Sequence, residues 1–94
     1  MELRNLRGPA VFSYRSRMDI IANILESAKE EISKTKLMYS CGLSFDHFQT
    51  YLNFLVEREL IEIFDRRGQI VIRRTNRGNE FLRLYYTIQN IINK

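Results

Sequence analysis

The chain has 94 residues, of which 45% are apolar, enough for one small domain with its own core but too few for two. Fifteen lysines and arginines against eleven acids give a net charge of +4, a moderate bias that is compatible with a polyanionic partner. A single cysteine excludes a disulfide within the chain, and no apolar run approaches the ~20 residues that span a bilayer. The first residues also lack the apolar stretch of a secretory signal, so we expect a cytoplasmic protein without a membrane anchor.

Residues 1–15 are predicted to form a basic N-terminal arm, because Gly8-Pro9 interrupts regular helix there. Ser16 and Asp19 then form a variant of the capping box, in which Asp replaces the usual Glu or Gln. Apolar residues recur behind them at helical spacing, which predicts a helix from about Arg17 to Glu30. These residues are Met18, Ile21, Ile24, Leu25 and Ala28.

Two further helices follow, with a sharp break between them. Ser33 caps a short helix that is predicted from about Lys34 to Cys41, and Gly42 ends it because glycine accepts a left-handed backbone without a Cβ clash. Ser44 caps the next helix, whose apolar stripe predicts the side that faces the core. The stripe consists of Phe45, Phe48, Tyr51, Leu52, Leu55 and Val56. Two helices joined by a short turn containing glycine are typical of a helix-turn-helix.

After Leu60 the apolar period changes from that of a helix to that of a strand. Residues 61–63 and 70–73 alternate in outline, and residues 65–69 between them form a hairpin loop in which Gly68 is available for a positive φ. Arg66 and Arg67 make the tip of this hairpin basic. Three helices followed by such a hairpin indicate a winged helix, an α+β fold that is mainly α.

Thr75 caps a last helix, predicted from about Asn76 to Asn93. Six of its apolar residues span roughly 120° of the helical wheel, and Leu82 and Tyr86 widen the arc to roughly 220°. One small domain covers only one side of such a helix, so we predict a homodimer in which two copies form an antiparallel coiled coil. The predicted dimer interface is Phe81, Leu84, Tyr85, Ile88, Ile91 and Ile92. The predicted domains are therefore the arm (1–15), a winged-helix DNA-binding domain (16–75) and a dimerisation helix (76–94).

Several short phrases between residues 15 and 85 resemble one family when they are taken together. They are Thr35-Lys36-Leu37-Met38-Tyr39, Leu43-Ser44-Phe45, Tyr51-Leu52, and Thr75-x-x-Gly78-x-x-Phe81-Leu82. In combination they resemble the archaeal winged-helix DNA-binding proteins, above all the family of the ten-kilodalton Sulfolobus DNA-binding proteins. The resemblance implies a dimeric, nucleoid-associated DNA-binding protein of an archaeon, or of a virus carrying archaeal-type regulators that acts in the host cytoplasm. It also implies dimerisation through an antiparallel C-terminal coiled coil.

The sequence departs from that family at informative positions. Family members usually carry several lysines on the second helix of the helix-turn-helix, whereas the free side of this one is mostly polar and carries none. They also tend to have glycine where Glu59 stands and an apolar residue where Arg74 stands, and the last helix here is shorter than in the chromatin-type members. These departures favour a sequence-selective transcriptional regulator over a protein that coats DNA indiscriminately.

In a helix-turn-helix the second helix enters the major groove. Gln49 and Asn53 suit the paired N7 and N6 groups of adenine, Asp46 can accept from cytosine N4, and Thr50 suits a thymine methyl. The predicted base-reading residues are Ser44, Asp46, His47, Gln49, Thr50 and Asn53.

Affinity is expected to come from cations that contact phosphates. The wing tip can follow the DNA backbone or enter the minor groove, and lysines at the start of a helix lie beside its positive end. The predicted phosphate and minor-groove contacts are Arg15, Arg17, Lys34, Lys36, Tyr39, Arg66, Arg67 and Arg73.

Two other functions remain open at this point: a non-specific architectural DNA binder, and a winged-helix module that binds proteins. An enzyme is not expected, because there is no Gly-rich phosphate loop and no nucleophile paired with a base in a recognisable spacing. His47 has no second ligand at a suitable spacing, so no metal is predicted, and no cofactor or small-molecule ligand is indicated. Cys41 is predicted to be a small buried filler.

Overall fold

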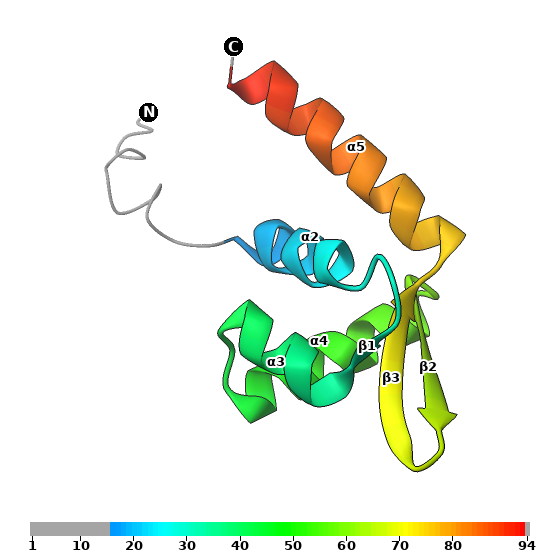
Figure 1. Cartoon of the computed structure of the whole chain (residues 1–94). Coiled ribbons are helices and arrows are strands. Elements are labelled where there is room, and N and C mark those ends of the chain that lie inside the picture. The colour runs from blue at the N-terminus through cyan, green and yellow to red at the C-terminus, as the bar shows by residue number, and fades with distance from the viewer. Residues whose placement is uncertain (1–15, 94) are drawn as a thin grey trace.

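The computed structural model describes residues 16–93, and it has the winged-helix fold, mainly helical as predicted (Figure 1). The elements are α2 (Arg17–Ser27), β1 (Ile32–Ser33), α3 (Lys34–Cys41), α4 (Phe45–Glu57), β2 (Ile61–Arg66), β3 (Gln69–Arg74) and α5 (Asn76–Ile92). The predicted arm and its Arg15 lie outside the described residues. None of the helices in the described part is long and apolar enough to cross a membrane.

All four predicted helix caps are confirmed. The hydroxyls of Ser16, Ser33, Ser44 and Thr75 each accept a hydrogen bond from the backbone N–H three residues ahead. The Asp19 carboxylate accepts in return from the backbone N–H of Ser16, so the capping-box variant is complete.

The first helix ends earlier than predicted, at Ser27 instead of about Glu30. The carbonyl oxygen of Ala28 accepts a hydrogen bond from the backbone N–H of Arg74 at 2.8 Å. This contact draws the chain toward β3, so it cannot continue as a helix. The prediction was wrong here because the partner is 46 residues away in sequence, outside any local pattern.

The sheet has three antiparallel strands in the order β1-β3-β2, with β3 in the centre. Strand β1 was not predicted, because two residues are too few for a period to show. The hairpin of β2 and β3 is confirmed and is tighter than expected, with a two-residue turn at Arg67 and Gly68. Both turn residues have positive φ, 56° and 87°, which suits the right-handed twist of the flanking strands.

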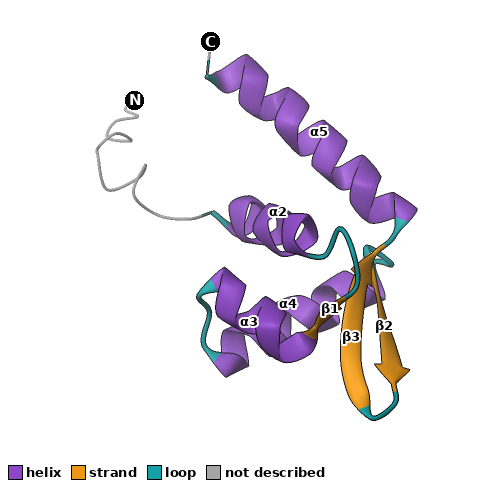
Figure 2. Ribbon diagram, viewed as in Figure 1, coloured by secondary structure: helices purple, strands orange, loops and turns teal. Residues whose placement is uncertain are grey.

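The core lies where α2, α3 and α4 meet the inner face of the sheet (Figure 2). Phe48 is fully buried there, and the predicted burial of Cys41 is confirmed. The predicted apolar stripe of α4 is too wide, however, because Phe45 is 59% exposed and Val56 is 42% exposed. Both stand at one edge of the stripe, about 50–70° from its centre on the helical wheel, where no element within residues 16–93 covers them.

Helix α5 packs on α2 through its first half. Leu82 is buried in the core, and the Tyr85 hydroxyl donates a hydrogen bond to the Asp19 carboxylate. That bond, together with burial, raises the pKa of Tyr85 to about 12. Close approach at the start of α5 requires Gly78, because a Cβ there would lie 2.5 Å from the carbonyl oxygen of Leu60.

The connection between α4 and β2 holds Glu59 in the left-handed region, at φ +62°. A residue with a side chain is strained by roughly 1 kcal/mol in that conformation, whereas glycine is not. We expect Glu59→Gly to raise the free energy of unfolding by about 0.5–1 kcal/mol, measured by urea denaturation. The matched change Glu57→Gly, at the end of α4, should lower it by about 0.5 kcal/mol. A less stable Glu59→Gly variant would contradict the assigned conformation.

Candidate nucleic-acid interface

Helix α4 presents a polar face to solvent on the side opposite its buried residues. Asp46, His47, Thr50 and Asn53 are exposed, and Gln49 is partly exposed. The helix contains no lysine or arginine between Phe45 and Glu57. This face therefore offers hydrogen-bonding groups with little positive charge.

Hydrogen bonds already orient several of these side chains. The Gln49 amide donates to the Asn53 side-chain oxygen at 3.0 Å, so the two amides are held together, one turn apart. The Thr50 hydroxyl donates to the backbone carbonyl of Asp46 at 2.9 Å. Because this bond uses the hydroxyl proton of Thr50, its methyl group remains for apolar contact.

One edge of this face borders α2. A hollow of about 350 Å³ separates the two helices. Its lining residues are Arg17, Ile21, His47, Thr50, Tyr51 and Phe54. The fold thus brings the predicted phosphate contact Arg17 beside two predicted base-reading residues, His47 and Thr50.

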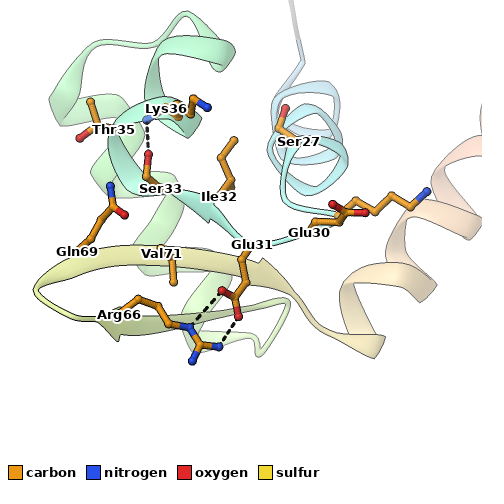
Figure 3. A pocket seen from close by; sticks show the side chains of 11 residues that line it. Ser27, Glu30, Glu31, Ile32, Ser33, Thr35, Lys36, Arg66, Gln69 and Val71 are labelled. Atoms are coloured by element: carbon orange, nitrogen blue, oxygen red, sulfur yellow. Dashed lines mark hydrogen bonds and ion pairs between the residues drawn. The ribbon is translucent and has the colours of Figure 1, made fainter.

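A second, larger groove of about 980 Å³ lies between the start of α3, the segment after α2, and the wing (Figure 3). Lys36, predicted as a phosphate contact, lines it, together with Thr35 and Gln69, which were not predicted. The start of a helix carries partial positive charge from its backbone N–H groups, which adds to the attraction of an anion to this groove. No local sequence signal identifies Gln69, because only the tertiary fold brings β3 next to α3.

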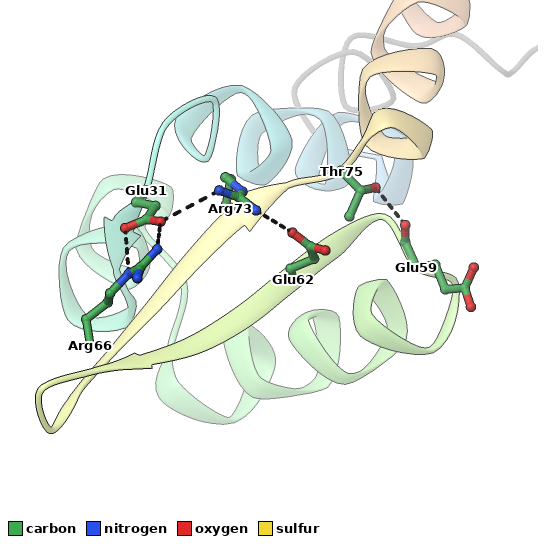
Figure 4. Close-up of polar contacts among 6 residues, drawn as sticks. All are labelled: Glu31, Glu59, Glu62, Arg66, Arg73 and Thr75. Atoms are coloured by element: carbon green, nitrogen blue, oxygen red, sulfur yellow. Dashed lines mark hydrogen bonds and ion pairs between the residues drawn. The ribbon is translucent and has the colours of Figure 1, made fainter.

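The wing carries an ion-pair cluster on its outer face (Figure 4). Arg66 donates to both carboxylate oxygens of Glu31, from Nε at 3.1 Å and from the second nitrogen of the fork. Arg73 lies 3.7 Å from Glu31 and donates to Glu62 at 2.9 Å. The hydrogen bond from Arg66 lowers the pKa of the Glu31 carboxyl and raises that of Arg66. Both guanidinium groups lie over the ring of Phe64, with centroid distances of 5.3 and 4.8 Å.

The two arginines predicted at the wing tip therefore differ. Arg66 is turned back toward β1 by Glu31, whereas Arg67 stands exposed at the turn and has no ion-pair partner among residues 16–93. Glu31 was not among the predicted site residues, because it is 35 residues from Arg66 in sequence and no local pattern links the two.

The remaining predicted phosphate contacts lie on α3. Tyr39 is 75% exposed, in keeping with a surface role. Lys34 lies with its Nζ 5.7 Å from the centroid of the exposed Phe45 ring. Both residues are accessible to a ligand that approaches along α3.

The predicted dimer face of α5 divides into two parts. Phe81 and Tyr85 are partly buried against the core of their own protomer, and their rings stack with centroids 6.4 Å apart. The other four residues are between 47% and 70% exposed: Leu84, Ile88, Ile91 and Ile92. The second half of α5 thus has an apolar surface that the rest of residues 16–93 leaves uncovered.

Comparison with known proteins agrees with this architecture. A family model described as winged helix-turn-helix matches residues 14–93. An uncharacterised protein of Methanocaldococcus jannaschii is 30% identical over 79 residues, which are 77% of this chain and 36% of that protein. The chain therefore spans about a third of the length of this relative.

Solved structures share the fold at low sequence identity. Sso10a-2, a DNA-binding protein from Sulfolobus solfataricus, has a TM-score of 0.76 at 22% identity, covering 84% of this chain and 83% of its own. The oxidised form of MarR from E. coli has a TM-score of 0.62 at 15% identity, covering 90% and 57%. The transcriptional repressor BigR from Xylella fastidiosa has a TM-score of 0.58 at 22% identity, covering 92% and 80%. The predicted resemblance to an archaeal winged-helix protein is confirmed.

Proposed function

Because the chain belongs to the winged helix-turn-helix family, we propose that it binds double-stranded DNA as a homodimer and acts as a sequence-selective transcriptional regulator. The observation that carries this proposal is the exposed face of α4, which is polar and carries neither lysine nor arginine. Such a face binds poorly to phosphates and well to base edges. The structural relatives described as a DNA-binding protein and a transcriptional repressor support the same conclusion.

In this proposal α4 lies in the major groove and the cations around it contact the backbone. Gln49 and Asn53, which are hydrogen-bonded to each other, present amide groups that suit adenine, and the Thr50 methyl suits thymine. Asp46, in the first turn of α4, accepts from cytosine while the helix start favours its negative charge. Ser44 and His47 complete the base-reading set.

The phosphate contacts are proposed to surround α4 on three sides. Arg17 contacts the backbone from α2, Lys34, Lys36 and Tyr39 from α3, and Arg67 from the wing. Residues 16–75 then serve as the DNA-binding domain, and the protein acts at the nucleoid in the cytoplasm.

The uncovered apolar face of α5 supports the dimer. Ile91 and Ile92 are 70% and 68% exposed, and residues of this kind are rarely left contiguous on a monomer surface. Two copies of residues 76–94 packed antiparallel would cover these side chains. A two-fold symmetric protein implies a two-fold symmetric site with half-sites about 34–36 Å apart, or a multiple of that distance.

The test is selection of binding sequences from random duplexes, followed by fluorescence anisotropy on the selected site. A two-fold symmetric consensus is expected. Gln49→Ala and Asn53→Ala should each weaken binding to that consensus by about 10- to 100-fold, since a bidentate base contact discriminates by ~1–3 kcal/mol. Binding to random duplex should change little.

Gln89→Ala removes the same amide from α5 and should leave both affinities unchanged. Equal affinity for all duplexes would indicate an architectural protein instead of a regulator. Absence of duplex binding at low salt would contradict the proposed function and favour a protein-binding module, for which the exposed Phe45 is a suitable contact.

A further inference from the structure

We propose that Glu31 is a positioning residue that withholds Arg66 from the DNA backbone, so that Arg67 alone contacts phosphates from the wing tip. This inference rests on the DNA-binding function proposed above.

The contact between Arg66 and Glu31 uses the same groups that would hold a phosphate. A guanidinium binds carboxylate and phosphate alike with two parallel N–H donors. Here Nε and a second nitrogen of Arg66 both donate to Glu31, so the fork is occupied. The ring of Phe64 beneath the guanidinium, 5.3 Å from its centre, holds it further against the wing.

Glu31 also stands where a DNA strand is expected to run. It lines the groove that contains Lys36, Thr35 and Gln69, beside the start of α3 (Figure 3). Its carboxylate there neutralises Arg66 and occupies its donors. This effect weakens DNA binding whatever the base sequence, because it acts on the backbone alone.

Arg73 does not take the place of Arg66 when Glu31 is changed. Its Nη2 donates to Glu62 at 2.9 Å, independently of its 3.7 Å contact with Glu31 (Figure 4). Loss of the Glu31 charge therefore releases Arg66 and leaves Arg73 held.

The experiment measures binding of the full chain to a random-sequence duplex as a function of salt. One additional phosphate contact steepens the plot of log affinity against log salt concentration by about 0.9. Between 1 M and 0.1 M salt this slope change adds a ~8-fold increase in affinity. Glu31→Gln is expected to steepen the slope by this amount for each bound protomer. Arg66→Ala alone is expected to leave the slope unchanged, and Arg67→Ala to reduce it by about 0.9 per protomer.

Two controls separate this role from a general charge effect. Glu80 on α5 receives the same two-nitrogen contact from Arg83, and its pKa is lowered for the same reason. Glu80→Gln thus removes one negative charge from a comparable ion pair that lies away from the groove. The salt slope of DNA binding by this variant should equal that of the wild type. In the Arg66→Ala background, Glu31→Gln should no longer steepen the slope.

Three results would overturn the proposal while leaving the proposed function intact. They are an unchanged slope for Glu31→Gln, a shallower slope for Arg66→Ala in an otherwise wild-type chain, and equal effects of Glu31→Gln and Glu80→Gln. A wild-type chain that binds no duplex even at low salt would overturn both.

Discussion

Replacing Ile88 by glutamate is expected to convert the proposed homodimer into a monomer and to weaken binding to a two-fold symmetric site by about 10²–10⁴-fold. Ile88 lies on the uncovered apolar face of α5 with Leu84, Ile91 and Ile92. A carboxylate buried between two such faces would lose its hydration without gaining a partner. The large loss in affinity follows because two linked half-site contacts become independent ones. Sedimentation velocity reports the association state, and fluorescence anisotropy reports the affinity.

Asn90→Glu is the matched control for this variant. Asn90 is exposed on the same helix, about 160° from Ile88 on the helical wheel. The substitution Asn90→Glu therefore adds the same charge outside the proposed interface. This variant should remain dimeric and keep its affinity. A wild-type chain that sediments as a monomer at micromolar concentration, or an Ile88→Glu variant that remains a dimer, would refute the proposed interface.

Replacing Phe48 by alanine is expected to lower the free energy of unfolding by about 3–5 kcal/mol. Phe48 has no solvent exposure and lies at the centre of the core, on the side of α4 opposite the polar face. Removing its ring leaves a cavity that the surrounding helices cannot fill without moving. Domains of this size are stable by only about 5–15 kcal/mol, so the variant should unfold at much lower urea concentration.

Phe45→Ala removes the same ring from the same helix and is expected to change the free energy of unfolding by less than about 1 kcal/mol. Phe45 is 59% exposed, and Lys34 is the side chain that lies over its ring. An exposed cation–π contact contributes roughly 0.5–1 kcal/mol. If both variants lost the same stability in urea denaturation, α4 would be rotated relative to the orientation described above, and its polar face would not be the reading face.

The helix starts and their caps were predictable because their causes are local. Ser33, Ser44 and Thr75 each bond to a backbone N–H three residues ahead, so the signal lies within one turn of the chain. The hairpin was predictable for a related reason, since its two-residue turn needs a residue that tolerates positive φ and Gly68 supplies one. Together these local signals determine the order of elements, and that order indicates the winged helix.

The candidate site was predictable only in part. The polar side of α4 follows from helical periodicity, which separates Phe48 and Leu52 from Asn53 and Thr50. The sequence pattern does not predict that Arg66 is held in an ion pair while Arg67 is not. That difference depends on Glu31, a residue distant in sequence. Periodicity also could not show that Phe45 stays exposed, since that depends on which neighbour packs beside the edge of the stripe.

The sequence by itself therefore determined the four helices and the hairpin, the helix caps, the turn of the wing and the face that α4 turns away from the core. These properties arise from backbone conformation and from contacts within a few residues. Only the tertiary structure decided which charges are neutralised in ion pairs, where α2 ends, and which half of α5 packs on its own core. Those outcomes depend on which side chains long-range packing brings within about 4 Å of one another, a distance that no local pattern encodes.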